Sequence, residues 1–329
     1  MDDSTNPASK PSASTRPAPP LPLPPRNPAG HKGTFGTVSV IGGCAMHPHR
    51  MAGAPALSAR AALRTGAGLA RLVMPAALCD IGLTLCPSAT ARPVRQLDDG
   101  DLDRNDLAAA MDAARFDQHV MAVGPGLSTG EGAQHTVMLA VGQGECHVVL
   151  DADGINSLGL LTDLQDTLVA PVIMTPHPGE FRRLARVLEM EQAIDTPEQR
   201  EQAAGEMARR LGCIVVLKGA GTVVTDGHRM YVNPTGNAAM ATAGTGDVLT
   251  GIIAGLAAQF VPPPSEPRPW PMAPRPADPS RPWSLYDAAC FGVWLHGAAG
   301  DAWCQSRNSP AGLLADELAD AVPGVLGSL

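Results

Sequence analysis

Lysine is scarce in this chain, whose 329 residues include only Lys10, Lys32 and Lys218. None of the three precedes a serine or threonine, so a Walker A phosphate-binding loop is excluded. No set of glycines has the G-x-G-x-x-G spacing, which also excludes the usual dinucleotide-binding fingerprint. Any phosphate-binding site in this protein must therefore be built in another way.

Closely spaced cysteines are also missing. The seven cysteines never come closer than seven positions apart, which excludes C-x-x-C zinc and redox motifs. No H-E-x-x-H sequence occurs, so the zinc protease motif is excluded as well. An odd and dispersed set of cysteines is typical of reduced thiols and predicts a cytoplasmic protein.

Aromatic residues make up only 3% of the chain, and acidic residues outnumber basic ones to give a net charge of −8. This charge argues against nucleic acid as a partner. The longest apolar stretch, residues 248–261, is too short to cross a bilayer, so no membrane segment is expected. With 44% hydrophobic residues, the composition predicts a globular protein whose core consists of Ala, Val, Leu and Ile.

Proline is concentrated in two segments, with nine of the 32 prolines in residues 1–30 and ten in residues 261–283. The first segment is poor in core-forming residues, and we expect a disordered tail without secretory or organellar targeting features. The second lies between two helical patterns and is predicted to be a surface insertion. One domain is therefore expected over residues 31–329.

Short β-branched runs alternate with amphipathic segments along this domain, which predicts an α/β fold with a central, mostly parallel sheet flanked by helices. The expected strands are Thr37–Ile41, Val120–Val123, His147–Leu150, Val172–Thr175 and Ile214–Leu217, with an antiparallel hairpin of Thr222–Thr225 and Arg229–Asn233. Helices are expected at Ala54–Thr65, Glu198–Leu211, Asp247–Gln259, Leu285–Cys304 and Ala315–Ala321. Ligands of such sheets bind beyond the carboxyl ends of the strands, so the loops that follow the strands are the candidate sites.

The loop Ala243-Gly244-Thr245-Gly246-Asp247 leads into the most apolar of these helices. Its two glycines leave backbone N–H groups accessible at a helix N-terminus, where the dipole favours an anion. Asp247 would then lie beside the anion and could accept a proton from a hydroxyl that attacks a phosphoryl group. The same spacing is equally compatible with Asp247 acting only as the cap of the helix.

The loop Lys218-Gly219-Ala220-Gly221-Thr222 directly follows a predicted strand. A long ammonium side chain beside two glycines favours contact with the phosphate or ribose of a nucleotide. A surface lysine in a glycine turn is the alternative interpretation.

Acidic residues follow two other strands and are the candidates for magnesium binding. Asp151 and Asp153 come after the strand His147–Leu150, and Glu180 opens a helix three residues after His177. Closely spaced carboxylates near a phosphate site suggest that Mg²⁺ is held through water. Helix capping by Asp153 and a favourable dipole position for Glu180 explain the same residues without a metal.

Taken together, these loops resemble the ADP/ATP-dependent NAD(P)H-hydrate dehydratases. The longest match is the segment Asn233–Leu256, which contains Gly244-Thr-Gly-Asp247. Five further motifs match in the same order: Lys32-Gly33 to Phe35-Gly36, Val149-Leu-Asp-Ala-Asp153, Thr175-Pro-His-Pro-Gly-Glu180, Lys218-Gly-Ala-Gly-Thr222 and Leu295-His-Gly-Ala-Ala-Gly-Asp301. The resemblance covers residues 31–327 without the insertion at 261–283.

The resemblance implies a ribokinase-like fold and a hydro-lyase that repairs nicotinamide nucleotides. The substrates would be NADHX and NADPHX, the hydrated cofactors. A nucleotide phosphorylates the ring hydroxyl, and loss of phosphate restores NADH or NADPH. The absence of an organellar signal favours ADP over ATP as the co-substrate, with Mg²⁺. A homotetramer and a partner epimerase on a separate chain are also implied.

The family roles map onto single residues of this sequence. Asp247 would be the catalytic base and a substrate contact, and Ala54, Gly126 and His177 would be further substrate contacts. The implied nucleotide contacts are Lys218, Gly219, Ala220, Gly221, Thr222 and Gly246. No metal ligand follows from the resemblance, and Asp151 and Glu180 stay the candidates.

Two features depart from the family pattern. The loop Cys44–Met51 is longer and more polar than the usual glycine turn, and Ser128 stands where a further glycine is common. Two other functions also fit parts of the pattern. A vitamin-precursor kinase of the same fold would share the Gly-Thr-Gly-Asp loop and stop at the phosphate ester. A non-catalytic nucleotide-binding regulator would tolerate the loss of Asp247.

Overall fold

The computed structural model describes residues 16–116, 120–161, 164–191, 193–264 and 280–329. Its centre is a nine-stranded sheet in the order β3-β2-β1-β4-β5-β6-β7-β8-β9. The strands β1 to β7 are parallel, and β8 and β9 close one edge as an antiparallel hairpin. The strands are Thr37–Ile41 (β1), Leu69–Pro75 (β2), Thr90–Val94 (β3), Val120–Val123 (β4), His147–Leu150 (β5), Val172–Met174 (β6), Ile214–Leu217 (β7), Val223–Thr225 (β8) and Met230–Val232 (β9).

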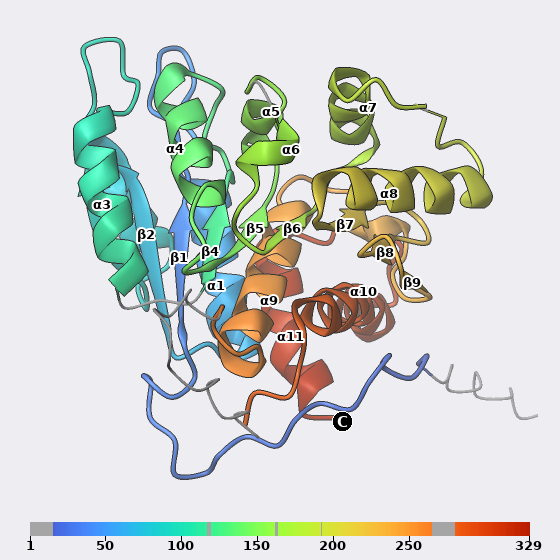
Figure 1. Ribbon diagram of the computed structural model, residues 1–329. Coiled ribbons are helices and arrows are strands. Elements are labelled where there is room, and N and C mark those ends of the chain that lie inside the picture. Colours follow the sequence, from blue (N-terminus) through green and yellow to red (C-terminus); the bar gives the residue numbers. More distant parts are fainter. Residues whose placement is uncertain (1–15, 117–119, 162–163, 192, 265–279) are drawn as a thin grey trace, which may run out of the picture.

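Helices cover both faces of the sheet, so the domain has three layers (Figure 1). The helices are Gly53–Thr65 (α1), Cys79–Leu85 (α2), Arg104–Phe116 (α3), Glu131–Val141 (α4), Asp153–Leu158 (α5), Leu164–Thr167 (α6), Pro178–Val187 (α7), Pro197–Leu211 (α8), Thr245–Phe260 (α9), Leu285–Arg307 (α10) and Ala315–Leu326 (α11). The helices α1, α9, α10 and α11 pack on one face, and α3, α4, α5, α7 and α8 pack on the other.

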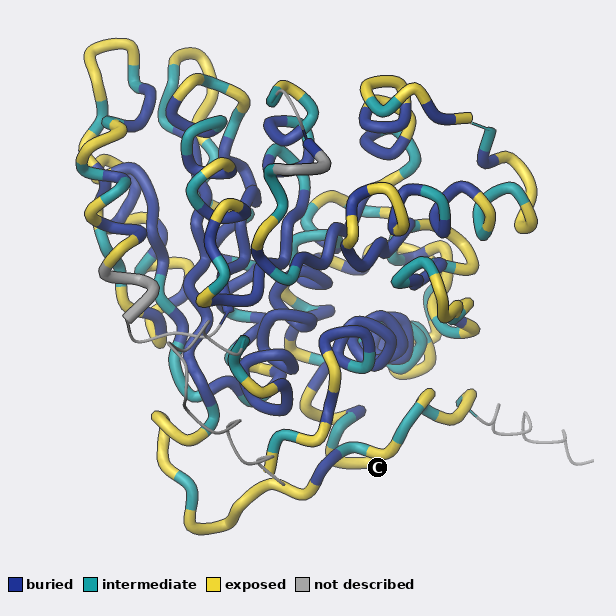
Figure 2. The backbone as a smooth tube through the Cα atoms, viewed as in Figure 1, coloured by how far each residue is buried: buried dark blue, intermediate teal, exposed yellow. Residues whose placement is uncertain are grey.

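Alternate residues of each inner strand face the two helical layers. In β4, Val120 and Ala122 belong to the core beneath α1 and α9, whereas Met121 and Val123 belong to the core on the opposite face. Both faces of a parallel sheet are buried in this way, which explains the continuous apolar runs in the sequence. Figure 2 shows the strands as the most completely buried part of the chain, with exposed residues on the outer helices and loops.

The predicted α/β sheet is confirmed, and the first, second, third and fifth expected strands have the predicted bounds. Two strands, β2 and β3, were not predicted. Arg71 interrupts the apolar run of β2, and Pro93 lies in β3. A proline is tolerated there because β3 is an edge strand, where one N–H needs no partner.

Residues 16–30 differ from the expected disordered tail; residues 1–15 lie outside the described part. Residues 16–30 form neither helix nor strand but pack against the domain, and we call this segment the strap. Leu21 and Leu23 contact the core, and the indole N–H of Trp294 donates to the carbonyl of Pro17 over 3.0 Å. The proline-rich composition allows this packing because an extended proline segment loses little conformational entropy on docking.

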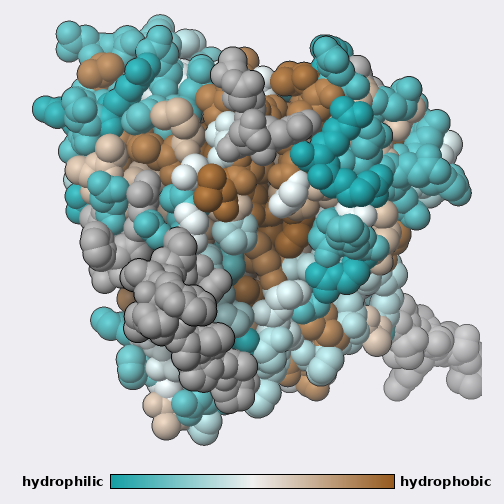
Figure 3. Space-filling view, in the orientation of Figure 1, coloured by the Kyte–Doolittle hydropathy of each residue, from teal (hydrophilic) through white to brown (hydrophobic). Residues whose placement is uncertain are grey.

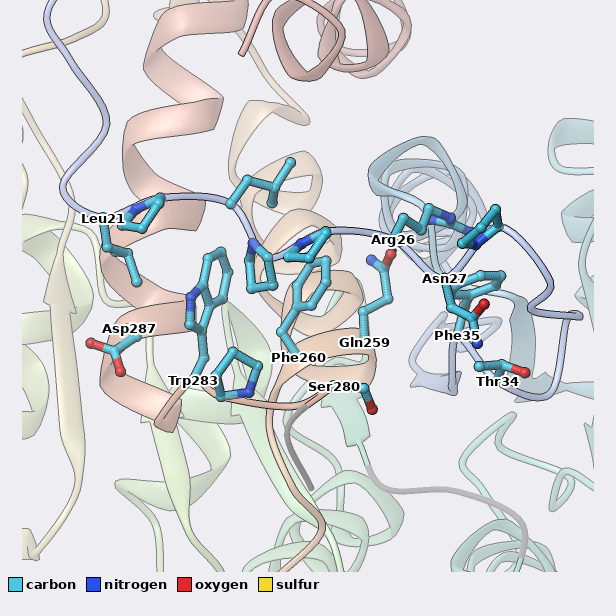
Figure 4. A pocket seen from close by; sticks show the side chains of 16 residues that line it. Leu21, Arg26, Asn27, Thr34, Phe35, Gln259, Phe260, Ser280, Trp283 and Asp287 are labelled. Atoms are coloured by element: carbon cyan, nitrogen blue, oxygen red, sulfur yellow. Dashed lines mark hydrogen bonds between the residues drawn. The ribbon is translucent and has the colours of Figure 1, made fainter. Parts of the chain in front are cut away.

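The strap crosses a cavity of about 830 Å³ in front of Phe260, Trp283 and Gln259 (Figure 4). Arg26 anchors it by donating to the side chain of Gln259 over 2.8 Å and by lying 3.7 Å over the ring of Phe35. Because an α-helix rises about 1.5 Å per residue, this cavity at the end of α9 lies roughly 20 Å from the first turn of that helix. The insertion predicted at 261–283 lies mainly outside the described residues.

Figure 3 shows that hydrophilic residues surround the visible face, whereas hydrophobic residues gather in its middle. None of the described helices is both long and apolar enough to cross a lipid bilayer.

Candidate active site

The loops that follow β5, β6 and β7 meet at one edge of the sheet because these three strands are parallel neighbours. Three side chains join there. The Lys218 ammonium lies 2.6 Å from Oδ1 of Asp151, and the Thr250 hydroxyl donates to Oδ2 of Asp151 over 2.7 Å. Asp151 is thus fully engaged and buried, with an exposed fraction of 1%. The contacts connect two strand ends with helix α9.

Glu180 is the second buried carboxylate of this edge, and Nζ of Lys218 lies 4.0 Å from its Oε2. Burial raises the pKa of Glu180, and the neighbouring charge of Asp151 adds to this effect. Burial alone would lower the pKa of Lys218. The carboxylates of Asp151, Glu180 and Asp247 outweigh it, and the pKa of Lys218 is raised. Lys218 is therefore a firmly charged cation among acidic groups.

Asp247 is the third residue of α9, and the N-cap position is occupied by Gly244. Its carboxylate has no hydrogen bond or ion pair with another residue in the described part of the chain. Burial, reinforced by the charge of Asp151, raises the pKa of Asp247 to about 7, although Lys218 opposes the shift. The capping interpretation of Asp247 is therefore wrong, and an unpartnered carboxyl with a pKa near neutrality is suited to accept a proton.

The first turn of α9 has the geometry of an anion site. The backbone N–H groups of Thr245, Gly246 and Asp247 have no hydrogen-bond acceptor among the described residues. A Cβ atom at Gly246 would lie 3.4 Å from Nζ of Lys218, so the helix start and the ammonium face each other. Unpaired N–H groups, the helix dipole and a nearby cation all favour a bound phosphate at this position.

Close packing of α1 against α9 holds this turn in place. A Cβ at Gly251 would lie only 2.1 Å from the carbonyl oxygen of Ser58, so only glycine permits the contact. The Ser58 hydroxyl donates to the backbone carbonyl of Asp247 over 2.8 Å. On the other side, the ring of His296 donates to the carbonyl of Thr245 over 2.8 Å, and burial lowers the pKa of His296 to about 4. A neutral His296 therefore supports the helix start.

The loop Lys218–Thr222 is open to solvent at Gly219, Ala220 and Gly221. Gly219 and Gly221 have φ values of 144° and 63°, which favour glycine. The Thr222 hydroxyl donates to the Gly219 carbonyl over 2.8 Å and closes the turn. The backbone of this loop is therefore exposed next to the ammonium of Lys218, as a nucleotide contact requires.

His177 caps α7, since its Nδ1 accepts the N–H of Gly179 over 2.9 Å while Glu180 accepts the N–H of His177. The other ring nitrogen lies 3.3 Å from Glu180, and half of the side chain is exposed. Burial, followed by the charges of Lys218 and Arg183, lowers the pKa of His177. The structure thus places a neutral, accessible imidazole beside the cluster, where its role as a substrate contact stays a prediction.

Ala54 and Gly126, the other two predicted substrate contacts, are neighbours. A Cβ at Gly126 would lie 3.4 Å from that of Ala54 and 3.0 Å from that of Met51. Ala54 also lies on α1, the helix whose Ser58 contacts Asp247. The structure therefore brings the predicted substrate residues to the same end of the domain as the predicted base.

The two metal candidates are engaged by the protein itself. Both oxygens of Asp151 accept hydrogen bonds from Lys218 and Thr250, and Glu180 is occupied by His177. No group of three His, Cys, Asp or Glu side chains that could hold a metal ion occurs in the described part of the chain. The alternative interpretation of Asp153 as a helix cap is wrong, because the N-cap of α5 is Ala152 and the Asp153 side chain accepts the N–H of Ser128. Asp151 and Glu180 are thus engaged within the protein, and their role as magnesium ligands stays a prediction.

Sequence reasoning missed Thr250 and Ser58, which support the site from inside the helical layer. Thr250 lies three residues after Asp247, so it is on the same side of α9. A buried threonine in an otherwise apolar helix is the signal that could have found it, because such a hydroxyl needs a partner.

Comparison with known proteins agrees with this geometry. The family model described as NAD(P)H-hydrate dehydratase matches residues 38–324. The ADP-dependent (S)-NAD(P)H-hydrate dehydratase of Neisseria meningitidis is 37% identical over 302 residues, which cover 88% of this chain and 85% of that protein. The bifunctional NAD(P)H-hydrate repair enzyme of Moorella thermoacetica is 36% identical over 310 residues. The match covers 93% of this chain but only 52% of that relative, so the chain spans about half the length of the bifunctional proteins.

The fold comparison gives the same family. The crystal structure of the ADP/ATP-dependent NAD(P)H-hydrate dehydratase of Bacillus subtilis, co-crystallized with ATP and Mg²⁺, superposes with a TM-score of 0.69 at 31% identity, covering 93% of this chain and 94% of that one. A hydroxyethylthiazole kinase from Pyrococcus horikoshii, at 14% identity and a TM-score of 0.50, shares the fold alone. The ribokinase-like fold expected from the sequence is therefore confirmed, and the chain belongs to the NAD(P)H-hydrate dehydratase family.

Proposed function

We propose that this chain dehydrates NADHX and NADPHX to NADH and NADPH in an ADP-dependent reaction. The observation that carries the proposal is the unpartnered carboxyl of Asp247 in the first turn of α9, facing a cluster that contains Lys218. The family membership and the ADP-dependent relative from Neisseria meningitidis support the substrate and the nucleotide.

The oxygen of the substrate ring hydroxyl would attack the terminal phosphorus of ADP while Asp247 accepts the proton of that hydroxyl. AMP would leave as the phosphoryl group is transferred. The N–H groups at the start of α9 and the Lys218 ammonium would stabilise negative charge on the transferred phosphoryl group. Breakage of the ring C–O bond, with loss of a proton from the adjacent ring carbon, would then release phosphate and restore the dihydropyridine.

Magnesium belongs to this proposal only as an ion that neutralises nucleotide phosphates. Mg²⁺ keeps several waters and is commonly held by substrate phosphates with few protein ligands. That mode fits a site in which Asp151 and Glu180 already have protein partners. A cytoplasmic location, a homotetramer and a functional partnership with an epimerase are carried into the proposal from the family resemblance.

The test is the recovery of dihydronicotinamide absorbance from NADHX or NADPHX with ADP or with ATP, together with measurement of released phosphate. With ADP, we expect one molecule of phosphate to be released for each molecule of NADH or NADPH that is formed. Consumption of nucleotide with a stable phosphate ester and no recovery of absorbance would contradict the proposal and indicate a kinase. Light scattering of the purified protein tests the tetramer.

A further inference from the structure

Arg200 lies behind the Lys218–Thr222 loop, although it is far from that loop in the sequence. It belongs to the first turns of α8 and is half-buried. Its Nη2 atom donates to the carbonyl of Leu217 over 3.1 Å and to the carbonyl of Lys218 over 3.2 Å. One planar group thus bridges the last residue of β7 and the first residue of the loop.

The guanidinium also occupies the space that a side chain at Gly219 would need. A Cβ at Gly219 would lie 2.9 Å from Nη2 and 3.3 Å from Nη1 of Arg200. Together with a φ of 144° at Gly219, this contact means that the path of the loop depends on both residues. The Thr222 hydroxyl fixes the other end of the same turn.

The charge of Arg200 is not neutralised by the protein in the part that the structure describes. No carboxylate forms an ion pair with it there, and its buried Nε has no hydrogen-bond partner. Burial lowers the pKa of Arg200. A half-buried cation without a counterion lowers the stability of the folded state, so a contribution to stability does not explain this arginine. Arg210 on the same helix differs, because it pairs with Glu206 and donates to the carbonyl of Leu188.

We propose that Arg200 is a positioning residue of the nucleotide site. By holding the carbonyls of Leu217 and Lys218 it sets the conformation of the loop that contacts ADP, and its charge favours the approach of the phosphates. This inference rests on the proposed function for the identity of the nucleotide. It adds to that function a residue that lies outside the six motifs by which the sequence resembles the family.

The experiment is titration of the full chain with ADP in the absence of hydrate, so that binding is read without turnover. Arg200→Met should raise the Kd for ADP about tenfold or more, because it removes both the bridge and the charge. Arg200→Lys keeps the charge, but its nitrogen ends one bond short of the position of Nη2, which makes both hydrogen bonds, so its Kd should be intermediate. Arg210→Met is the matched control and should bind ADP within about twofold of the wild type.

At saturating ADP, Arg200→Met should have a kcat and a KM for the hydrate close to those of the wild type. When the ADP concentration is varied instead, its KM for ADP should be raised. Wild-type affinity for ADP in a folded Arg200→Met variant would overturn the inference. If that variant does not fold, Arg200→Lys decides, and an unchanged Kd in it would overturn the inference equally. A wild-type chain that binds no ADP would overturn the proposed function itself, which is a separate result.

Discussion

Lys218 and Asp151 form an ion pair of 2.6 Å that joins the end of β7 to the end of β5 across the intervening strand β6. The pair explains two properties of the site at once. The carboxylate fixes the ammonium that faces the start of α9, and its negative charge helps to raise the pKa of Asp247.

Replacing Asp247 tests the catalytic step. Asp247→Asn keeps the size of the side chain but cannot accept a proton, so kcat should fall about 10²-fold or more. Nucleotide affinity should stay near wild type, and the melting temperature at neutral pH should not fall below wild type, because the carboxylate makes no capping bond and its buried charge costs stability. Asp316→Asn, in the first turn of α11, is the matched control. Near-normal kcat in Asp247→Asn would refute the role of base.

The pH dependence follows from the raised pKa of Asp247, which is about 7. Since the base must be ionised, kcat/KM should rise with pH and reach half of its maximum near that value. Asp151→Asn removes a charge that raises this pKa, so the midpoint should move to lower pH. A midpoint that does not move in this variant would show that Asp151 has no electrostatic effect on the base.

The same shift predicts the effect of pH on stability. The folded pKa of Asp247 lies above its ordinary value of 3.8, so the folded state binds more protons between about pH 4 and pH 7. The contribution of Asp247 to stability is therefore lost as the pH rises through this window. The unfolding free energy of Asp247→Asn relative to the wild type should therefore increase from about pH 4 to about pH 7, as measured by denaturant unfolding at both pH values. Equal differences at the two ends would contradict this.

The buried ion pair can be dissected with two variants. Lys218→Met should raise the KM for nucleotide and also destabilise the fold by about 3 kcal/mol, because it leaves the charge of Asp151 unpaired. Adding Asp151→Asn should recover most of the stability but not the KM. If the double variant is as unstable as Lys218→Met, the loss of stability has another cause than the unpaired carboxylate.

The strap predicts different outcomes for two deletions. Removal of residues 16–28 with the preceding segment should lower the unfolding free energy by about 2 kcal/mol or more, since it uncovers apolar surface and the indole N–H of Trp294. Removal of residues 1–15 alone should leave the stability nearly unchanged. Trp294→Phe, which removes the bond to Pro17 and also leaves a cavity in the buried core, should cost about 1 kcal/mol or more. Equal stability of both deletions would show that the strap contributes nothing.

The contact between α1 and α9 depends on a glycine. Gly251→Ala would place a Cβ 2.1 Å from the Ser58 carbonyl, so the two helices must separate at a cost of about 1–3 kcal/mol. The kcat should fall too, because Ser58 holds the carbonyl of Asp247. Gly324→Ala in α11 meets no atom within 4 Å and serves as the control. It should be neutral or stabilising.

The strands β1 and β4 to β7 and the helices α1 and α8 to α11 could be predicted because their burial leaves a local pattern of apolar residues in the sequence, whereas β2, β3 and the helices α2, α3, α4 and α6 were not predicted. The order of six motifs, including Gly244–Asp247 and Lys218–Thr222, also sufficed to identify the family, since these motifs are local. The prediction was weakest at β3, where Pro93 and exposed residues give no apolar run.

The sequence alone left Asp247 open between a base and a cap; the tertiary structure shows that it makes no capping bond, and its role as the base stays a prediction. The sequence left it open because a pKa near 7 depends on burial and on the charge of Asp151, which follows the distant strand β5. The engagement of Asp151 by Lys218 and Thr250, and the position of Arg200 behind the loop, likewise follow from the order of strands in the sheet. The packing of residues 16–30 was missed because their composition shows only that they cannot form a core of their own. Their docking depends on Phe260 and Trp283, which line the cavity, and on the indole N–H of Trp294, all far along the chain. Local patterns therefore determined the elements and the family of this protein, and contacts between remote segments determined the charge states and the supports of its site.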